Sequence, residues 1–157
     1  MKTSYLLHNK YKKFGWILLV LGLIIGALFY TEAIDNELLK VKVLSFYSNG
    51  SFMDEEKSFF QIIETGLLDE IISILIIIGG LLVGFTKEKI EDEFIYQLRK
   101  DSLAWAIITN YIVLLFAVIF IYNFTFFDVL IFNMFTPLLI FIIRFNFLKF
   151  KFNSNEE

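Results

Sequence analysis

The fold is decided by the stretch TKEKIEDEFIYQLRKDSLAWA, residues 86–106, which is strongly charged and stands between two long apolar runs. From Glu88 to Lys100, its acids gather near the beginning and its bases Arg99 and Lys100 near the end, with Lys89 as the exception. This order suits the dipole of an α-helix. The stretch therefore predicts a cytoplasmic helical segment over residues 87–101, beginning at about Glu88, that runs directly into a transmembrane helix.

Apolar side chains recur at helical spacing within this segment. They form a candidate partner-binding face made of Ile90, Phe94, Ile95 and Leu98. Such a face is able to lie on the membrane surface, to pack under a helix bundle or to bind a cytoplasmic protein. The alternative is that the segment is a solvated extension of the next span.

The composition indicates a membrane protein. Of 157 residues, 57% are hydrophobic, and the mean hydropathy is +0.68. Soluble domains of this size carry a larger polar fraction. Because each span takes about 20 apolar residues, the chain has room for four spans and one modest loop, but not for a separate catalytic domain.

Four apolar runs predict spans over about residues 14–31, 67–86, 102–122 and 126–147. The outer loop over residues 32–66 is acidic, and it contains an alternating pattern at 40–47 followed by the turn signal Asn49-Gly50. These features predict a small hairpin or a pair of short elements. The expected fold class is an all-α membrane protein with four transmembrane helices, a third helix extended into the cytoplasm and one sizeable outer loop.

Basic residues predict the orientation. Eleven of the 14 Lys and Arg residues fall in the N-terminal tail, in residues 86–101 or from Arg144 onward, and three fall in the outer loop. Positive charge concentrates on the cytoplasmic side of membrane proteins. We therefore expect a multi-pass protein of the bacterial inner membrane with both termini in the cytoplasm.

Two glycine pairs are candidate helix-packing sites. Gly22 and Gly26 form a GxxxG pair in the first span, and Gly80 and Gly84 lie on one face of the second. Small residues at this spacing let helix backbones approach closely. The alternative is that glycine is simply common in membrane helices.

The deepest polar groups form a candidate polar membrane site made of Asn110, Asn133, Thr136 and Pro137. Pro137 removes the backbone hydrogen bond to the carbonyl of Asn133 and favours a kink. The arrangement is compatible with a small polar cavity at the kink. The alternative, which we favour, is that these groups make interhelical hydrogen bonds that hold the bundle together.

A third candidate is an outer acidic cluster of Asp69, Glu70 and Asp128, all at the outer boundary of the predicted spans. Carboxylates gathered there could bind a cation. However, an acid at the beginning of a helix also stabilises the helix dipole without any ligand.

Several classes of function are disfavoured by the residues present. The chain has no cysteine, and its single histidine is His8 in the N-terminal tail. The net charge of −3 gives no reason to expect direct nucleic-acid binding. No catalytic triad, Gly-rich phosphate loop or metal-ligand spacing is present. We therefore expect no catalytic residue, no metal and no cofactor, and we expect that the protein is not an enzyme.

Three stretches carry a resemblance to a protein family. They are LLHNKYKKFGW at residues 6–16, LLDEIISILIIIGGLLVGFTKEKIEDEFIYQLRKDSLAWAIITNYIVLLF at 67–116 and NMFTPLLIFIIRFNF at 133–147. The chain resembles small four-span integral membrane proteins of Bacteroidota, which are often encoded beside a helix-turn-helix regulator; His8 stands where that family would have proline. The likeness covers residues 6–30 and 67–147. It implies topology and bacterial source, and it carries over no catalytic residue.

The first functional hypothesis is a non-catalytic membrane protein that acts through protein–protein interaction as a scaffold, sensor or regulatory partner. The alternative is a small oligomeric transporter or channel that uses Asn110, Asn133 and Pro137. Expected partners are the lipid bilayer and either another protein or further copies of this chain.

Overall fold

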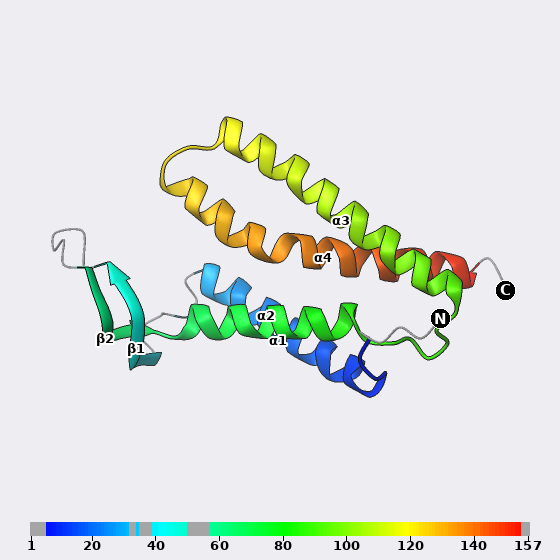
Figure 1. Cartoon of the computed structure of the whole chain (residues 1–157), viewed down its shortest axis with the longest axis horizontal. Coiled ribbons are helices and arrows are strands. Elements are labelled where there is room, and N and C mark those ends of the chain that lie inside the picture. The colour runs from blue at the N-terminus through cyan, green and yellow to red at the C-terminus, as the bar shows by residue number, and fades with distance from the viewer. Residues whose placement is uncertain (1–5, 32–33, 35–38, 50–56, 155–157) are drawn as a thin grey trace. The chain divides into compact units, whose positions relative to one another are not determined.

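The computed structural model describes residues 6–31, 34, 39–49 and 57–154. The element order within these residues is α1 (Lys10–Tyr30), β1 (Lys40–Asn49), β2 (Lys57–Gly66), α2 (Leu68–Gly84), α3 (Glu93–Phe120) and α4 (Phe124–Ser154) (Figure 1). The chain forms two compact units. The smaller unit is Gly22–Ile74, and the larger unit combines Met1–Leu21 with Leu75–Glu157.

Three of the described helices, α1, α3 and α4, are long and apolar enough to cross a membrane. With 17 residues, α2 is about 26 Å long at 1.5 Å per residue, which is less than the ~30 Å hydrocarbon core. In contrast, the 28 residues of α3 make a helix of about 42 Å. Both helices lie where the sequence predicted apolar runs, at residues 67–86 and 102–122.

The loop predicted over residues 32–66 contains a pair of antiparallel strands, as its alternating pattern predicted. Strands β1 and β2 pair antiparallel, with Lys42 opposite Glu64 and Leu44 opposite Ile62. The Lys42 and Glu64 side chains form an ion pair at 3.2 Å. The backbone N–H of Leu67 donates to the carbonyl of Leu39, which ties the two ends of the hairpin together beside α2. The all-α description is therefore wrong for this part of the chain.

The third helix begins at Glu93 and not at about Glu88, so the prediction of a helical segment over residues 87–101 is wrong for its first residues. The cause is the N-cap. Asp92 has extended backbone angles, and its side chain accepts a hydrogen bond from the backbone N–H of Ile95 at 2.8 Å. An aspartate in this position satisfies a donor that the first helical turn leaves free.

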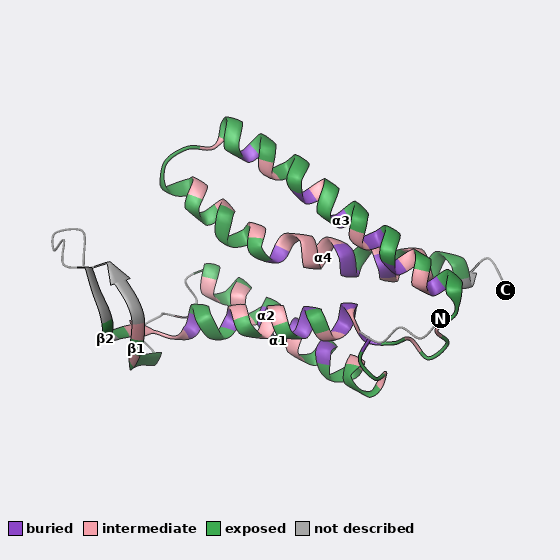
Figure 2. Cartoon of the chain, in the orientation of Figure 1, coloured by how far each residue is buried: buried purple, intermediate pink, exposed green. Residues whose placement is uncertain are grey.

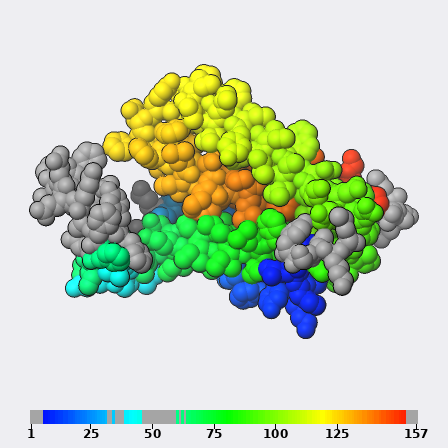
Figure 3. Space-filling model, in the orientation of Figure 1, coloured from blue at the N-terminus to red at the C-terminus, as the bar shows by residue number. Residues whose placement is uncertain are grey.

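Helices α3 and α4 run antiparallel and are joined by a tight turn (Figure 1). Asn123 adopts a φ of 62° there, and its carbonyl accepts from the N–H of Phe126. Asparagine tolerates this left-handed conformation better than most residues. In the space-filling view, α3 in green to yellow lies along α4 in orange (Figure 3).

The core of the larger unit is concentrated toward the C-terminal half of α4 (Figure 2). Phe141 and Phe145 are almost fully buried there, as are Ala106 of α3 and Val83 of α2. The rings of Phe85 and Phe141 lie 5.7 Å apart. Away from this region, most of the surface of α3 and α4 is apolar and exposed, as is usual for helices that face lipid.

Helices α1 and α2 cross at Gly15 and Gly79. A Cβ atom added at Gly79 would lie 2.8 Å from the Cα of Leu19, and one added at Gly15 would lie 3.0 Å from the backbone nitrogen of Val83. Backbone atoms are unable to move aside as flexible side chains do. This crossing therefore requires glycine at both positions.

Candidate functional site

The non-helical segment 85–92, between α2 and α3, is held against the N-terminal segment. Leu7 donates to the carbonyl of Phe85 and accepts from the N–H of Lys87, each at 2.9 Å. The Asn9 side chain donates to the carbonyl of Lys87 at 2.7 Å. These hydrogen bonds fix a loop that the sequence alone predicted to be helical.

Glu88 joins three parts of the chain within the larger unit. Its Oε1 accepts hydrogen bonds from the Nζ of Lys12 on α1 and, at 3.1 Å, from the Nζ of Lys149 on α4. The Glu88 side chain is only 11% exposed. Burial alone would raise the pKa of Glu88, but the hydrogen bonds and charges of Lys12 and Lys149 outweigh it, so the pKa is lowered from its ordinary value.

A second buried ion pair holds the other half of the loop. Arg99 on α3 binds both carboxylate oxygens of Glu91, at 2.6 and 3.1 Å. The Arg99 side chain is 3% exposed, and its Nη2 also donates to the carbonyl of Thr86 at 3.4 Å. Glu91 in turn accepts from the backbone N–H of Glu88. The bidentate geometry stabilises the loop and also fixes its orientation relative to α3.

The ring of Phe145 lies at the centre of these charges. Lys12, Arg99 and Lys149 place their cationic groups 5.9, 5.1 and 6.0 Å from its centroid. Cations at this distance from an aromatic ring are stabilised by its quadrupole. We call the five residues Lys12, Glu88, Glu91, Arg99 and Lys149 the ion-pair cluster. Because its members come from α1, the 85–92 loop, α3 and α4, the cluster brings three basic segments to one end of the larger unit.

The four residues of the predicted partner-binding face do not share one exposed surface. Ile95 is buried, and Leu98 is half-buried on α3. Phe94 is 40% exposed, and its ring packs against that of Phe152 on α4, 4.1 Å between centroids. Ile90 lies in the loop before the helix and is 78% exposed. Of the four predicted residues, Ile90 and Phe94 are therefore the exposed ones, and Phe152, which contacts Phe94, is 38% exposed.

The predicted polar membrane site is an amide pair. Asn110 and Asn133 exchange two side-chain hydrogen bonds, at 3.0 and 3.4 Å, between α3 and α4. The hydroxyl of Thr136 donates to the carbonyl of Phe132 on its own helix. A groove of about 340 Å³ lies beside the pair and includes Pro137 and Tyr111 in its lining.

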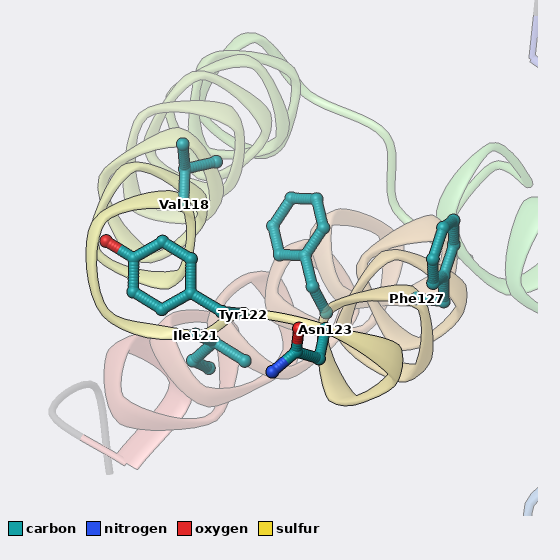
Figure 4. A pocket seen from close by; sticks show the side chains of 6 residues that line it. Val118, Ile121, Tyr122, Asn123 and Phe127 are labelled. Atoms are coloured by element: carbon teal, nitrogen blue, oxygen red, sulfur yellow. The ribbon is translucent and has the colours of Figure 1, made fainter.

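A second groove lies at the turn between α3 and α4. Val118, Ile121, Tyr122, Asn123 and Phe127 contribute to its lining, and its volume is about 330 Å³ (Figure 4). The Tyr122 hydroxyl donates to the carbonyl of Ile119 at 2.6 Å. With that hydroxyl already paired, the groove presents mainly apolar side chains.

Two of the four predicted helix-packing glycines face α4. An added Cβ at Gly80 would meet the Leu138 side chain, and one at Gly84 would meet the ring of Phe141. In the smaller unit, a Cβ at Gly26 would lie 3.1 Å from a methyl group of Ile72. Gly22 is buried.

The predicted acidic cluster stays a prediction. Asp69 and Glu70 lie in the first turn of α2, within the smaller unit, whereas Asp128 lies near the beginning of α4 in the larger one. All three side chains are exposed. Among the described residues, no group of three or more His, Cys, Asp and Glu is placed to hold a metal ion.

Sequence reasoning missed the roles of Gly15 and of the ion-pair cluster. A signal for the cluster was present, because the positive-inside pattern already assigned Lys12, residues 86–101 and Lys149 to the same side of the membrane. Opposite charges confined to one side are available to pair. The pattern does not specify which basic residue pairs with which acidic residue.

No family model, curated protein or solved structure matches this chain. Function is therefore inferred from the residues and their geometry alone.

Proposed function

We propose that this chain is a four-span protein of the bacterial inner membrane that acts without catalysis, by docking another protein at its cytoplasmic end. Both termini and the 85–92 loop would face the cytoplasm. The ion-pair cluster supports this orientation, because it gathers Lys12, Arg99 and Lys149 at one end of the larger unit. The short helix α2 would then span by local bilayer thinning or by snorkelling of Lys87.

One observation carries the docking proposal. Ile90 is a large aliphatic side chain, 78% exposed, in a charged loop outside the three helices that are apolar enough to span. Lipid contact accounts for the exposed apolar residues within the proposed spans 102–122 and 126–147, but it does not account for Ile90 in the loop. Phe94, four residues further along the chain, is 40% exposed and contacts Phe152 on α4. Apolar patches outside a membrane mark binding surfaces.

The ion-pair cluster gives this surface a fixed shape. Glu88 and Glu91 flank Ile90 in the sequence, and each is bound to cations on a helix. The loop is thereby pre-organised, so a partner would not need to order it on binding. We propose a regulatory or membrane partner protein with an apolar contact site for Ile90.

The test is co-purification from the native membrane in a mild detergent. The Ile90→Asp variant should lose the partner, because an acid replaces the apolar contact at a site where the fold is not at risk. Ile90→Leu should retain it. The matched control Lys89→Asp adds an acid at the neighbouring exposed position without removing an apolar side chain, and it should also retain the partner.

Undiminished recovery with Ile90→Asp would refute docking at this surface. Recovery of a homo-oligomer without any other protein would also count against docking, and it would favour the alternative of a small transporter or channel. That alternative has its own supporting observation, the groove beside Asn110, Asn133 and Pro137. It predicts solute or ion flux in reconstituted vesicles that is lost on Asn110→Leu.

A further inference from the structure

Arg144 on α4 is the one arginine of the described chain that lacks an acidic partner. No carboxylate within the described residues lies within ion-pair distance of it, and its Nε is buried without a hydrogen-bond partner. The other arginine, Arg99, is held bidentate by Glu91. Arg144 thus carries a full charge, with five N–H donors, and none of the described residues supplies an acceptor.

Arg144 does have an aromatic partner. Its guanidinium carbon lies 4.8 Å from the centroid of the Trp105 ring on α3. The Trp105 side chain is 53% exposed. The pair therefore lies on the outer surface of the α3–α4 hairpin and not in its core. Stacking on an indole orients the guanidinium and leaves its N–H edge available to an acceptor.

The depth of this pair follows from helix geometry. Lys149 of the ion-pair cluster lies five residues further along α4, about 7.5 Å away at 1.5 Å per residue. Asn133 lies eleven residues in the other direction, about 16 Å deeper. With the ion-pair cluster on the cytoplasmic side, as the proposed orientation requires, Arg144 and Trp105 fall at the inner boundary of the hydrocarbon. Tryptophan is enriched at this level.

We propose that Arg144 and Trp105 form a binding site for the phosphate group of an anionic phospholipid in the inner leaflet. An unpaired arginine within the membrane boundary is costly. A phosphate supplies two acceptor oxygens in the geometry that a guanidinium fork matches, and it neutralises the charge. The ring of Trp105 would lie against the glycerol and upper acyl region of the same lipid.

The experiment uses the full chain in mild detergent and native mass spectrometry, with phosphatidylglycerol or phosphatidylcholine added. The wild type should retain phosphatidylglycerol in preference to phosphatidylcholine. Arg144→Gln should lower phosphatidylglycerol retention by roughly tenfold, because a charge-assisted pair of hydrogen bonds is lost. The control Lys151→Gln removes the same charge from an exposed position on the same helix and should leave retention within about twofold, since exposed charges contribute little.

A second readout keeps the test valid if Arg144→Gln is poorly folded. Trp16 and Trp105 are the two tryptophans of the chain, so a Trp16→Phe variant reports on Trp105 alone. Brominated phosphatidylglycerol should quench this fluorescence more than brominated phosphatidylcholine does. Arg144→Lys keeps the charge but not the fork, and it should reduce the difference without removing it.

Equal retention by the wild type and Arg144→Gln, or equal quenching by the two lipids, would overturn the proposal. Displacement of the lipid by millimolar inorganic phosphate would assign the site to free phosphate and contradict a lipid source. Failure of the docking proposal looks different, because Ile90→Asp would then retain the partner protein whatever lipid is bound.

Discussion

Arg99 donates two hydrogen bonds to Glu91, from Nη1 to Oε1 at 2.6 Å and from Nη2 to Oε2 at 3.1 Å. The pair connects α3 to the loop that precedes it, and it is nearly fully buried. Removing one member of a buried pair leaves a charge without compensation. We therefore treat this contact as the main support of the 85–92 loop.

The Arg99→Ala variant should lower the free energy of unfolding by about 3 kcal/mol. The measurement is denaturant titration in mixed micelles, with a double-mutant cycle that adds Glu91→Ala. The exposed ion pair of Lys42 and Glu64 is a matched control, and Lys42→Ala should cost less than about 1 kcal/mol. Equal costs for Arg99→Ala and Lys42→Ala would show that burial of the Arg99 pair does not contribute.

The ionisation of Glu88 should make the stability of the protein depend on pH in the acidic range. Its pKa in the folded protein is lowered by Lys12 and Lys149 despite burial, so it lies below the value of the unfolded chain. The stabilisation is present above the unfolded value, about 4.3, and it is lost as pH falls through the folded pKa. The thermal stability of the wild type should therefore decrease as the pH drops below about 4.3. Glu88→Gln should be less stable at pH 7 and show a flatter profile; an unchanged profile would remove Glu88 from this role.

We expect the hydrogen bonds between Asn110 and Asn133 to stabilise the packing of α3 against α4 and not to form a transport site. Asn110→Leu leaves the Asn133 amide unpaired between two helices and should cost about 1 kcal/mol. The double variant with Asn133→Leu should recover most of that loss, because no unpaired amide remains. Unfolding midpoints of the two single variants and the double variant decide the matter. A double variant whose cost equals the sum of the two single costs would contradict a simple amide pair.

Substitution by alanine should change the stability of the protein differently at Gly79 and at Gly26. Alanine favours a helix over glycine by about 1 kcal/mol, but at Gly79 the new methyl group would meet the backbone of Leu19. Gly79→Ala should therefore lower stability by about 1–3 kcal/mol. At Gly26 the nearest atom is a side-chain methyl of Ile72 at 3.1 Å, which can shift. Gly26→Ala should be close to neutral. The same loss at both sites would argue against a backbone contact at Gly79.

Some parts of the fold could be predicted from the sequence, and others could not. Long apolar runs gave the helices, since hydrophobicity over about 20 residues is a strong signal, and the alternation at residues 40–47 gave the hairpin. The beginning of α3 was missed because several acids precede it and only the geometry selects Asp92 as the cap. The Glu88 contacts join residues 76 and 61 positions apart, so no local pattern specifies them. Gly15 is a lone glycine whose need for close approach appears only when α2 is placed beside it.

The docking surface and the lipid site both depend on which side of the membrane the ion-pair cluster faces. Because the chain has no native cysteine, single cysteines can report this directly in intact cells with a membrane-impermeant maleimide. Glu64→Cys on the hairpin and Tyr122→Cys at the α3–α4 turn should be labelled from outside. Lys89→Cys and Lys151→Cys should be labelled only after permeabilisation. Labelling of positions 64 and 89 from the same side would mean that α2 does not cross, and it would contradict the four-span account.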